Sequence, residues 1–305
     1  METYATMDVG SNQVLLYIAK VDGKGIVQTL LDKGEITKLG EGINQTGELK
    51  KEAMDRTFNV LKEFKKLLDE YRVKDYRAVG TSVLREAKNS SVFLNRVKEE
   101  LGIEINVIPG EEEARLSCLA VIGGLDLGNK KTAVIDIGGG STEFIFGEGP
   151  TIKDRFSLKI GSLKMTEQFL KSDPVTDEEF NSLMDFLKGQ FEKDVKSPFD
   201  NPYLVGMGGT MTNLGAMYHK LEKYDPNVVH GTEISLNELN TMIDGVKSKT
   251  IEERRSIKGL QPKRVEVILA GMGILKAIME RLKADKVVVS DRGLRHGLFF
   301  ESFCS

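Results

Sequence analysis

The chain has 305 residues, which is enough for two domains at roughly 100 to 200 residues each. Hydrophobic residues make up 40% of it and charged residues 29%, a composition that argues against a disordered chain. Forty-three Lys and Arg stand against 46 Asp and Glu, so no strong overall charge recruits nucleic acid or an anionic membrane. Any polyanion that the protein binds must therefore be met by a local group of cations.

Cysteine content and hydropathy place the protein in a compartment class. Cys118 and Cys304 are too few for the disulfide framework of a secreted protein, and neither has the spacing of a metal ligand. Residues 1–10 lack the basic and apolar regions of a signal peptide. The most apolar later stretch, residues 267–275, is far shorter than a membrane span. We expect a cytoplasmic protein.

Two strand-to-turn signals each occur twice in the chain. The first is a strand that ends in Asp and enters a glycine turn, at Asp8-Val-Gly-Ser-Asn12 and again at Asp136-Ile-Gly-Gly-Gly-Ser141. The second is a short strand that ends at Gly80 and again at Gly206. Asp8 and Gly80 are 72 residues apart, and Asp136 and Gly206 are 70 apart. This near-equal spacing predicts a duplicated domain.

Further strands and helices extend the repeat. Apolar residues 103–108 and 286–290 predict a third pair of strands, so the second copy contains additional helices before its last strand. Each copy then combines a hairpin with alternating helices and strands, which indicates a mixed sheet covered by helices. Two such copies facing one another would form a cleft, with ligands at the carboxyl ends of the strands. The expected helices cover residues 49–71, 92–101, 176–195, 236–246 and 264–282.

The glycine turns suit the binding of phosphate. Three residues without Cβ at 138–140 allow backbone N–H groups to approach an anion, and the preceding Asp136 can hold a divalent metal. A tight hairpin uses glycine equally well. Duplicated Asp-x-Gly turns, together with Gly208-Gly-Thr210, favour a phosphate-binding site.

Two more motifs lie at expected helix starts. Gly110-Glu-Glu-Glu-Ala-Arg115 places three acids in a first turn, where each is favoured by about 0.3–1 kcal/mol. A carboxylate at that edge could also orient and deprotonate a water molecule. Gly80-Thr-Ser-Val-Leu-Arg85 combines hydroxyls, N–H groups and an Arg, as an anion site does. A helix cap followed by a solvent-facing Arg explains the second motif as well.

Seven ordered motifs across essentially the whole chain resemble the exopolyphosphatase and guanosine pentaphosphate phosphatase family. That family has the duplicated α/β fold of actin, sugar kinases and Hsp70. The resemblance implies an N-terminal lobe at residues 1–124 and a C-terminal lobe at 125–292, with residues 293–305 packing on the first lobe. The motifs are Asp8–Asn12, Gly80–Arg85, Gly110–Arg115, Val134–Glu143, Gly161–Lys164, Val205–Thr210 and Ser290–Arg295.

The resemblance also implies roles for individual residues. It makes Glu113 the catalytic base and makes Asp136 and Glu143 ligands of Mg²⁺ or Mn²⁺, with Asp8 facing the metal. Longer members of the family carry a further helical domain, and this chain resembles a short form without it. His296 stands where an acidic residue is expected, and we expect that change to affect only the rim of the site. The implied phosphate-binding residues are Ser11, Asn12, Thr81, Arg85, Gly138, Gly139, Gly140, Ser141, Gly208, Gly209 and Thr210.

The expected activity is a metal-dependent phosphohydrolase that releases terminal orthophosphate from inorganic polyphosphate, with guanosine pentaphosphate as a second possible substrate. Two alternatives stay open: an ATP-dependent phosphotransferase of the sugar and acetate kinase type, and a non-catalytic sensor of polyphosphate or guanosine tetraphosphate. We expect no nucleic-acid or membrane partner, and a homodimer is left open. Four cations fit either a basic track for the substrate or plain solvent exposure: Lys263, Arg264, Arg292 and Arg295.

Overall fold

The computed structural model describes residues 1–22, 27–125, 127–149 and 151–304. The chain forms two compact units, Met1–Ala120 with Leu294–Ser305, and Val121–Gly293. The division falls slightly before the expected boundary at 124/125, and the last helix belongs to the first unit. Each unit contains one mixed sheet.

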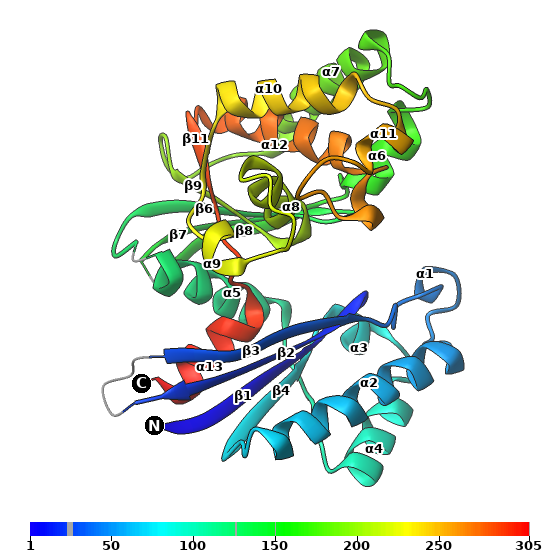
Figure 1. Cartoon of the computed structure of the whole chain (residues 1–305), viewed down its shortest axis with the longest axis vertical. Coiled ribbons are helices and arrows are strands. Elements are labelled where there is room, and N and C mark those ends of the chain that lie inside the picture. Colours follow the sequence, from blue (N-terminus) through cyan, green and yellow to red (C-terminus); the bar gives the residue numbers. More distant parts are fainter. Residues whose placement is uncertain (23–26, 126, 150, 305) are drawn as a thin grey trace. The chain divides into compact units, whose positions relative to one another are not determined.

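The sheet of the first unit has the order β3-β2-β1-β4-β5 (Figure 1). Its first three strands form an antiparallel meander, whereas β4 pairs in parallel with both β1 and β5. The carboxyl ends of β1, β4 and β5 therefore lie at one edge, which is the edge of the Asp8, Gly80 and Gly110 motifs. The strands are β1 (Glu2–Val9), β2 (Gln13–Val21), β3 (Val27–Ile36), β4 (Asp75–Gly80) and β5 (Asn106–Val107).

Helices cover both faces of this sheet. Because side chains alternate along a strand, Leu16 and Ile18 of β2 join one core with Phe58 of α2, whereas Tyr17 joins a second with Phe299 of α13. The last helix thus packs on the face opposite α2. The helices of this part of the chain are α1 (Ile43–Thr46), α2 (Lys51–Glu70), α3 (Ser82–Glu86), α4 (Ser90–Leu101), α5 (Gly110–Leu125) and α13 (Leu294–Phe303).

The sheet of the second unit has the order β10-β11-β9-β6-β7-β8. Read from β8, it repeats the first sheet: a three-stranded antiparallel meander, then two parallel strands, with β10 added at the far edge. This repetition confirms the expected duplicated α/β fold. The strands are β6 (Lys131–Ile137), β7 (Thr142–Glu148), β8 (Thr151–Leu158), β9 (Tyr203–Met207), β10 (Glu233–Ser235) and β11 (Lys286–Val289).

The core of the second unit is larger, because α12 is buried along most of its length between other helices and the sheet (Figure 1). The helix expected at 264–282 begins only at Ile268. Arg264 instead ends a short 3₁₀ turn, η1 (Pro262–Arg264), which Pro262 begins. The helices are α6 (Ser162–Phe169), α7 (Asp177–Asp194), α8 (Gly208–Tyr218), α9 (Pro226–Val229), α10 (Leu236–Lys247), α11 (Ile251–Arg254) and α12 (Ile268–Leu282).

Within the described ranges, every helix is too short or too polar to cross a membrane.

Candidate active site

In the first unit, the loop after β1 lies against the loop after β4. The Thr81 N–H donates to the Val9 carbonyl at 3.3 Å, and the Ser11 and Ser82 hydroxyl oxygens are 3.4 Å apart. Ser11 and Asn12 are exposed, whereas Thr81 is buried. Two of the expected phosphate-binding segments are therefore neighbours.

Glu113 stands in the first turn of α5, where the N–H groups of Glu112 and Glu113 both donate to the Pro109 carbonyl. Arg85 Nη1 donates to Glu113 Oε2 at 3.2 Å and to the Ile108 carbonyl at 2.7 Å. Both side chains are about one-third exposed, 32% for Arg85 and 33% for Glu113. The expected base is thus held in a charge-assisted pair with one of the expected phosphate ligands, at a place that solvent reaches.

Asp8, at the end of β1, has a buried carboxylate oxygen without a partner. Among the described residues its Oδ1 is one of few buried polar side-chain atoms that accept no hydrogen bond. Burial and, to a smaller extent, the Glu113 carboxylate raise the pKa of Asp8 to about 7, although Arg295 opposes part of this shift. Two carboxylates and an unsatisfied oxygen are what a cation or a proton would stabilise.

Arg295, the cation that lowers the pKa of Asp8, forms hydrogen bonds with a different carboxylate. Arg295 binds Asp32 with two hydrogen bonds, of 2.7 and 2.9 Å, and His296 Nε2 lies 3.0 Å from the same carboxylate. Although burial alone would raise the pKa of Asp32, the charge of Arg295 and the His296 contact hold it at about 2. The expectation that His296 lies at the rim is wrong: it is 4% exposed and packs edge-on against Tyr17, 4.5 Å between ring centres.

In the second unit, the glycine turn after β6 is packed against the start of α6. The Gly138 N–H closes the turn on the Ser141 carbonyl, and the N–H groups of Ser162 and Leu163 donate to the carbonyls of Gly138 and Gly139. A Cβ at Gly161 would lie 2.5 Å from the Gly139 carbonyl carbon, so no other residue fits this contact. The turn is thereby held in one conformation, while Gly140 stays exposed.

Asp136 and the start of α8 form the second cluster of this unit. Gly208 has a φ of +81°, and a Cβ there would lie 2.2 Å from Asp136 Oδ1, so both conformation and space require glycine. A Cβ at Gly209 would lie 2.1 Å from Arg264 Nη2. Burial lowers the pKa of Arg264, and Asp136 raises it in part. Thr210, buried, donates to the Ile137 carbonyl at 2.7 Å and ties α8 to β6.

Glu143 is paired with Asp136 in the antiparallel register of β6 and β7, so both carboxylates lie on one face of the sheet. Glu143 Oε1 accepts hydrogen bonds from Ser141 at 2.6 Å and Ser157 at 2.9 Å. In the described ranges no group of three or more His, Cys, Asp or Glu side chains is set to hold a metal. Two carboxylates nevertheless suit Mg²⁺, which takes one or two from the protein and completes its shell with water and phosphate.

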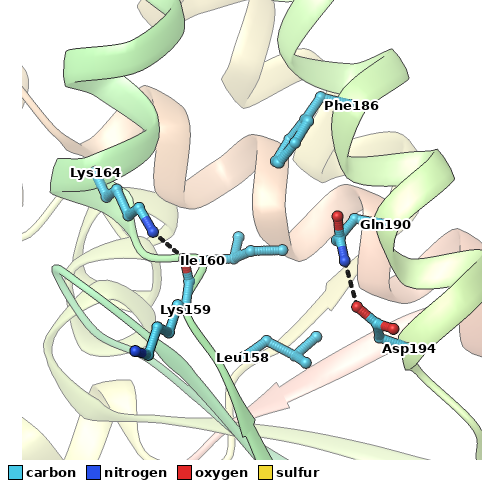
Figure 2. Close-up of a pocket in the computed structure, with 7 residues that line it drawn as sticks. All are labelled: Leu158, Lys159, Ile160, Lys164, Phe186, Gln190 and Asp194. Carbon is cyan, nitrogen blue, oxygen red and sulfur yellow. Dashed lines mark hydrogen bonds between the residues drawn. The ribbon is translucent and has the colours of Figure 1, made fainter.

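Lys164 lies beside a cavity of about 250 Å³ at the edge of this sheet (Figure 2). Its Nζ donates to the Lys159 carbonyl at 2.9 Å, and Gln190 and Asp194 line the opposite wall of the cavity. Of the four cations that the sequence left open, Arg264 adjoins the turn at Gly208–Thr210, where phosphate binding is expected, and Arg295 binds Asp32. The side chain of Arg292 packs on Gly124, and Lys263 is exposed.

Comparison with known proteins identifies the family of the chain. The model of the Ppx/GppA phosphatase family matches residues 17–305. A crystal structure of the type II variant of the Aquifex aeolicus Ppx/GppA phosphatase superposes with a TM-score of 0.89 at 39% identity, covering 99% of this chain and 100% of that one. The resemblance seen in the seven motifs is thus confirmed.

Three curated relatives carry functional names. A "Bifunctional 3-dehydroquinate synthase/phosphatase" of Fusobacterium nucleatum is 33% identical over 97% of this chain and 46% of its own length. A "Guanosine-5'-triphosphate,3'-diphosphate pyrophosphatase" of Photobacterium profundum is 33% identical over 98% of this chain and 59% of its own length. "Exopolyphosphatase 2" of Mycobacterium tuberculosis is 29% identical, with 96% of each chain covered. The chain thus spans only about half the length of the first two.

Proposed function

The chain belongs to the Ppx/GppA phosphatase family, and on that premise we propose that it is a metal-dependent phosphohydrolase that releases terminal orthophosphate from a phosphoanhydride chain. Its substrate is inorganic polyphosphate or guanosine pentaphosphate. The names of the relatives support this substrate class. The cytoplasmic location expected from the sequence is part of the same proposal.

Glu113 is the proposed base. It accepts a proton from the attacking water, a role that needs a carboxylate accessible to water and held in one orientation. Its one-third exposure and its hydrogen bond from Arg85 support that role. Arg85 also offers guanidinium N–H groups to a substrate phosphate. This pairing of Arg85 with Glu113 is the observation that carries the proposal.

The second unit supplies the proposed grip on phosphate. Backbone N–H groups at the glycine turns, at residues 138–141 and 208–210, can approach an anion because no Cβ stands in the way. Arg264 adds a cation beside Gly209. In phosphoryl transfer, positioning and neutralisation of charge do most of the work, and this cluster is suited to both.

Mg²⁺ or Mn²⁺ would be held by Asp136 and Glu143 of the second unit. The two opposed carboxylates of β6 and β7 fit such an ion, since like charges facing each other across a sheet are unfavourable until a cation neutralises them. When bound, the ion would neutralise phosphate oxygens. Asp136 and Glu143 orient it, and the serine contacts hold Glu143 in place.

One assay tests the proposed function. Purified protein with Mg²⁺ is incubated with short polyphosphate, long polyphosphate, guanosine pentaphosphate and ATP, and released phosphate is measured. We expect release from polyphosphate or guanosine pentaphosphate, and none once EDTA removes the metal. Transfer of phosphate from ATP to an acceptor, without release from the other substrates, would favour the phosphotransferase. Tight binding without turnover of any of them would favour the sensor.

A further inference from the structure

A second, smaller cavity of the Val121–Gly293 unit lies beside the far end of α8. Its volume is about 170 Å³. That is less than the roughly 300–1,000 Å³ that enclose a whole drug-sized ligand, so the cavity has room for only one part of a larger molecule. Apolar and polar groups share its walls: Leu221, Tyr224, Leu260 and Pro262 with Glu222 and Gln261.

The cavity and the proposed phosphate-binding turn at Gly208–Thr210 both include residues of α8. Gly259, with a φ of +85°, is packed so closely on this helix that a Cβ would lie 2.2 Å from the Ala216 carbonyl oxygen. The Gln261 N–H donates to Asn213 Oδ1 at 2.9 Å, and Asn213 Nδ2 donates to the Gly209 carbonyl at 2.8 Å. Asn213 therefore links a residue of the cavity directly to a residue of the turn.

Residues 259–262, which line the cavity, lie just before Arg264, the cation beside the turn at Gly208–Thr210. Pro262 begins η1, and this 3₁₀ turn ends at Arg264, whose guanidinium lies over Gly209. Gly208 begins α8, and Ala216 lines the cavity eight residues later. At 1.5 Å per residue the two sites are about 12 Å apart along the helix. A nucleoside that carries several phosphates spans such a distance, with its base at one end.

We propose that this cavity receives the base of a nucleoside polyphosphate whose phosphates lie at Gly208–Thr210. Tyr224 gives it an aromatic side chain that is 39% exposed, and Leu221, Leu260 and Pro262 provide apolar contacts for a flat ring. Glu222 and Gln261 offer polar groups for the edge of the base. Inorganic polyphosphate has nothing to place there, so the cavity distinguishes a nucleotide substrate from a chain of phosphates.

This inference rests on the proposed function for the position of the phosphates, but its test does not need turnover. Calorimetry compares the binding of GDP and of pyrophosphate, two ligands that differ by the nucleoside. Wild-type protein is expected to bind GDP at least about 5-fold more tightly, since stacking of one base on an aromatic ring is worth about 5- to 150-fold in affinity.

The chain offers a closely matched pair of tyrosines for the mutational arm. Tyr224 lines the cavity, is 39% exposed and donates its hydroxyl to Asp291, whereas Tyr218 is outside the cavity lining, is 37% exposed and donates to Glu238. Tyr224→Ala should abolish the preference for GDP, and Tyr224→Phe and Tyr218→Ala should keep it. With turnover, Tyr224→Ala should raise KM for guanosine pentaphosphate and leave KM for tripolyphosphate unchanged.

Equal binding of GDP and pyrophosphate by the wild-type protein would overturn the inference. So would a preference for GDP that Tyr224→Ala and Tyr218→Ala weaken alike, or one that neither of them weakens. Loss of the preference in Tyr224→Ala with a normal thermal unfolding curve supports it. Absence of phosphate release from every substrate would refute the proposed hydrolase instead, and would leave the result of the binding comparison standing.

Discussion

The two Asp-x-Gly turns have the same place in two sheets of the same topology, yet different residues surround them. Asp8, in the first copy, has a buried oxygen without a partner and lies near the Glu113 carboxylate. Asp136, in the second, adjoins Gly208 and lies within the electrostatic influence of Arg264. The repeated backbone therefore fixes where a carboxylate stands, and the following loops decide what it can do.

The arginines show the same difference. Arg295 of the first unit is neutralised by Asp32, whose carboxylate also contacts His296. In the part of the chain that the structure describes, the side chain of Arg264 makes no hydrogen bond or ion pair, so its guanidinium is available to an anion. The first copy thus places two carboxylates, Asp8 and Glu113, near each other, whereas the second combines the paired carboxylates Asp136 and Glu143 with glycine turns and the cation Arg264.

The largest expected effect is the loss of turnover on changing Glu113, the proposed catalytic base. Glu113→Gln should lower kcat by about 10²–10⁴, because a positioned base contributes that much to proton transfer. Binding of polyphosphate should persist, since the amide keeps the shape of the side chain. Steady-state kinetics and calorimetry measure the two quantities. Glu111→Gln, an exposed acid of the same helical turn, serves as the control. Near wild-type turnover of Glu113→Gln would remove Glu113 from the mechanism.

Arg264→Gln tests the cation of the second copy. We expect kcat/KM to fall by about 10- to 100-fold, since a hydrogen bond to a charged group contributes about 1.5–3 kcal/mol. The salt dependence of KM should become shallower, because one cation fewer meets the polyanion. Lys263→Gln changes the exposed neighbour and should alter both quantities little. Equal effects of the two variants would mean that only general charge matters.

Asp32→Asn tests whether the arginine of the first copy is structural. The pKa of Asp32 is lowered from 3.8 to about 2, so its ionised form stabilises the fold above pH 4, and this contribution disappears as the pH falls from 4 to 2. The variant should lose about 2 kcal/mol of unfolding free energy at pH 7. Near pH 2 it should equal the wild type. Denaturant unfolding at both pH values checks this; a loss that is the same at pH 2 contradicts the account.

Gly208→Ala and Gly10→Ala compare the two turns themselves. At Gly208 alanine meets both a φ of +81° and Asp136, so we expect a loss of about 1–2 kcal/mol from the backbone conformation alone. At Gly10 a Cβ would lie 3.2 Å from the Gln13 carbonyl without a left-handed φ, and the loss should be smaller. Thermal unfolding measures both. The reverse order would show that the second turn tolerates a side chain.

The last expected effect has the opposite sign, a gain in stability. Because burial and Glu113 raise the pKa of Asp8 to about 7, its ionised form destabilises the folded state as the pH rises from about 4 to 7. Without divalent metal at pH 8, Asp8→Asn should raise Tm, because the amide carries no charge that burial and Glu113 disfavour. At pH 4 the two proteins should unfold alike. A lower Tm of the variant at pH 8 would show that the charge is already compensated.

The repeated fold could be predicted from the sequence, but the contacts that depend on tertiary packing could not. The two strand-to-turn signals and their spacing predicted the repeated sheets, because register and turns are local properties of the chain. Arg264 and Arg295 could not be told apart. Each stands near the end of an element, and only the packing places one over Gly209 and the other against Asp32. His296 was misplaced for the same reason, since its partner is 264 residues away.

The cavity proposed for the nucleotide base could not be predicted from the sequence either. Tyr224 and Pro262 carry no motif, and no periodic pattern joins them. They meet because Gly259 lets its segment pack on the backbone of α8. The expected cleft between the two copies and the possible homodimer stay predictions.

Attack by water on the terminal phosphorus is the central claim, and isotope transfer tests it most directly. Tripolyphosphate is incubated with the protein and Mg²⁺ in H₂¹⁸O, and the products are separated and weighed by mass spectrometry. We predict one ¹⁸O atom in the released orthophosphate and none in the pyrophosphate that remains. Release of orthophosphate without ¹⁸O, or ¹⁸O found in the pyrophosphate, would contradict the account.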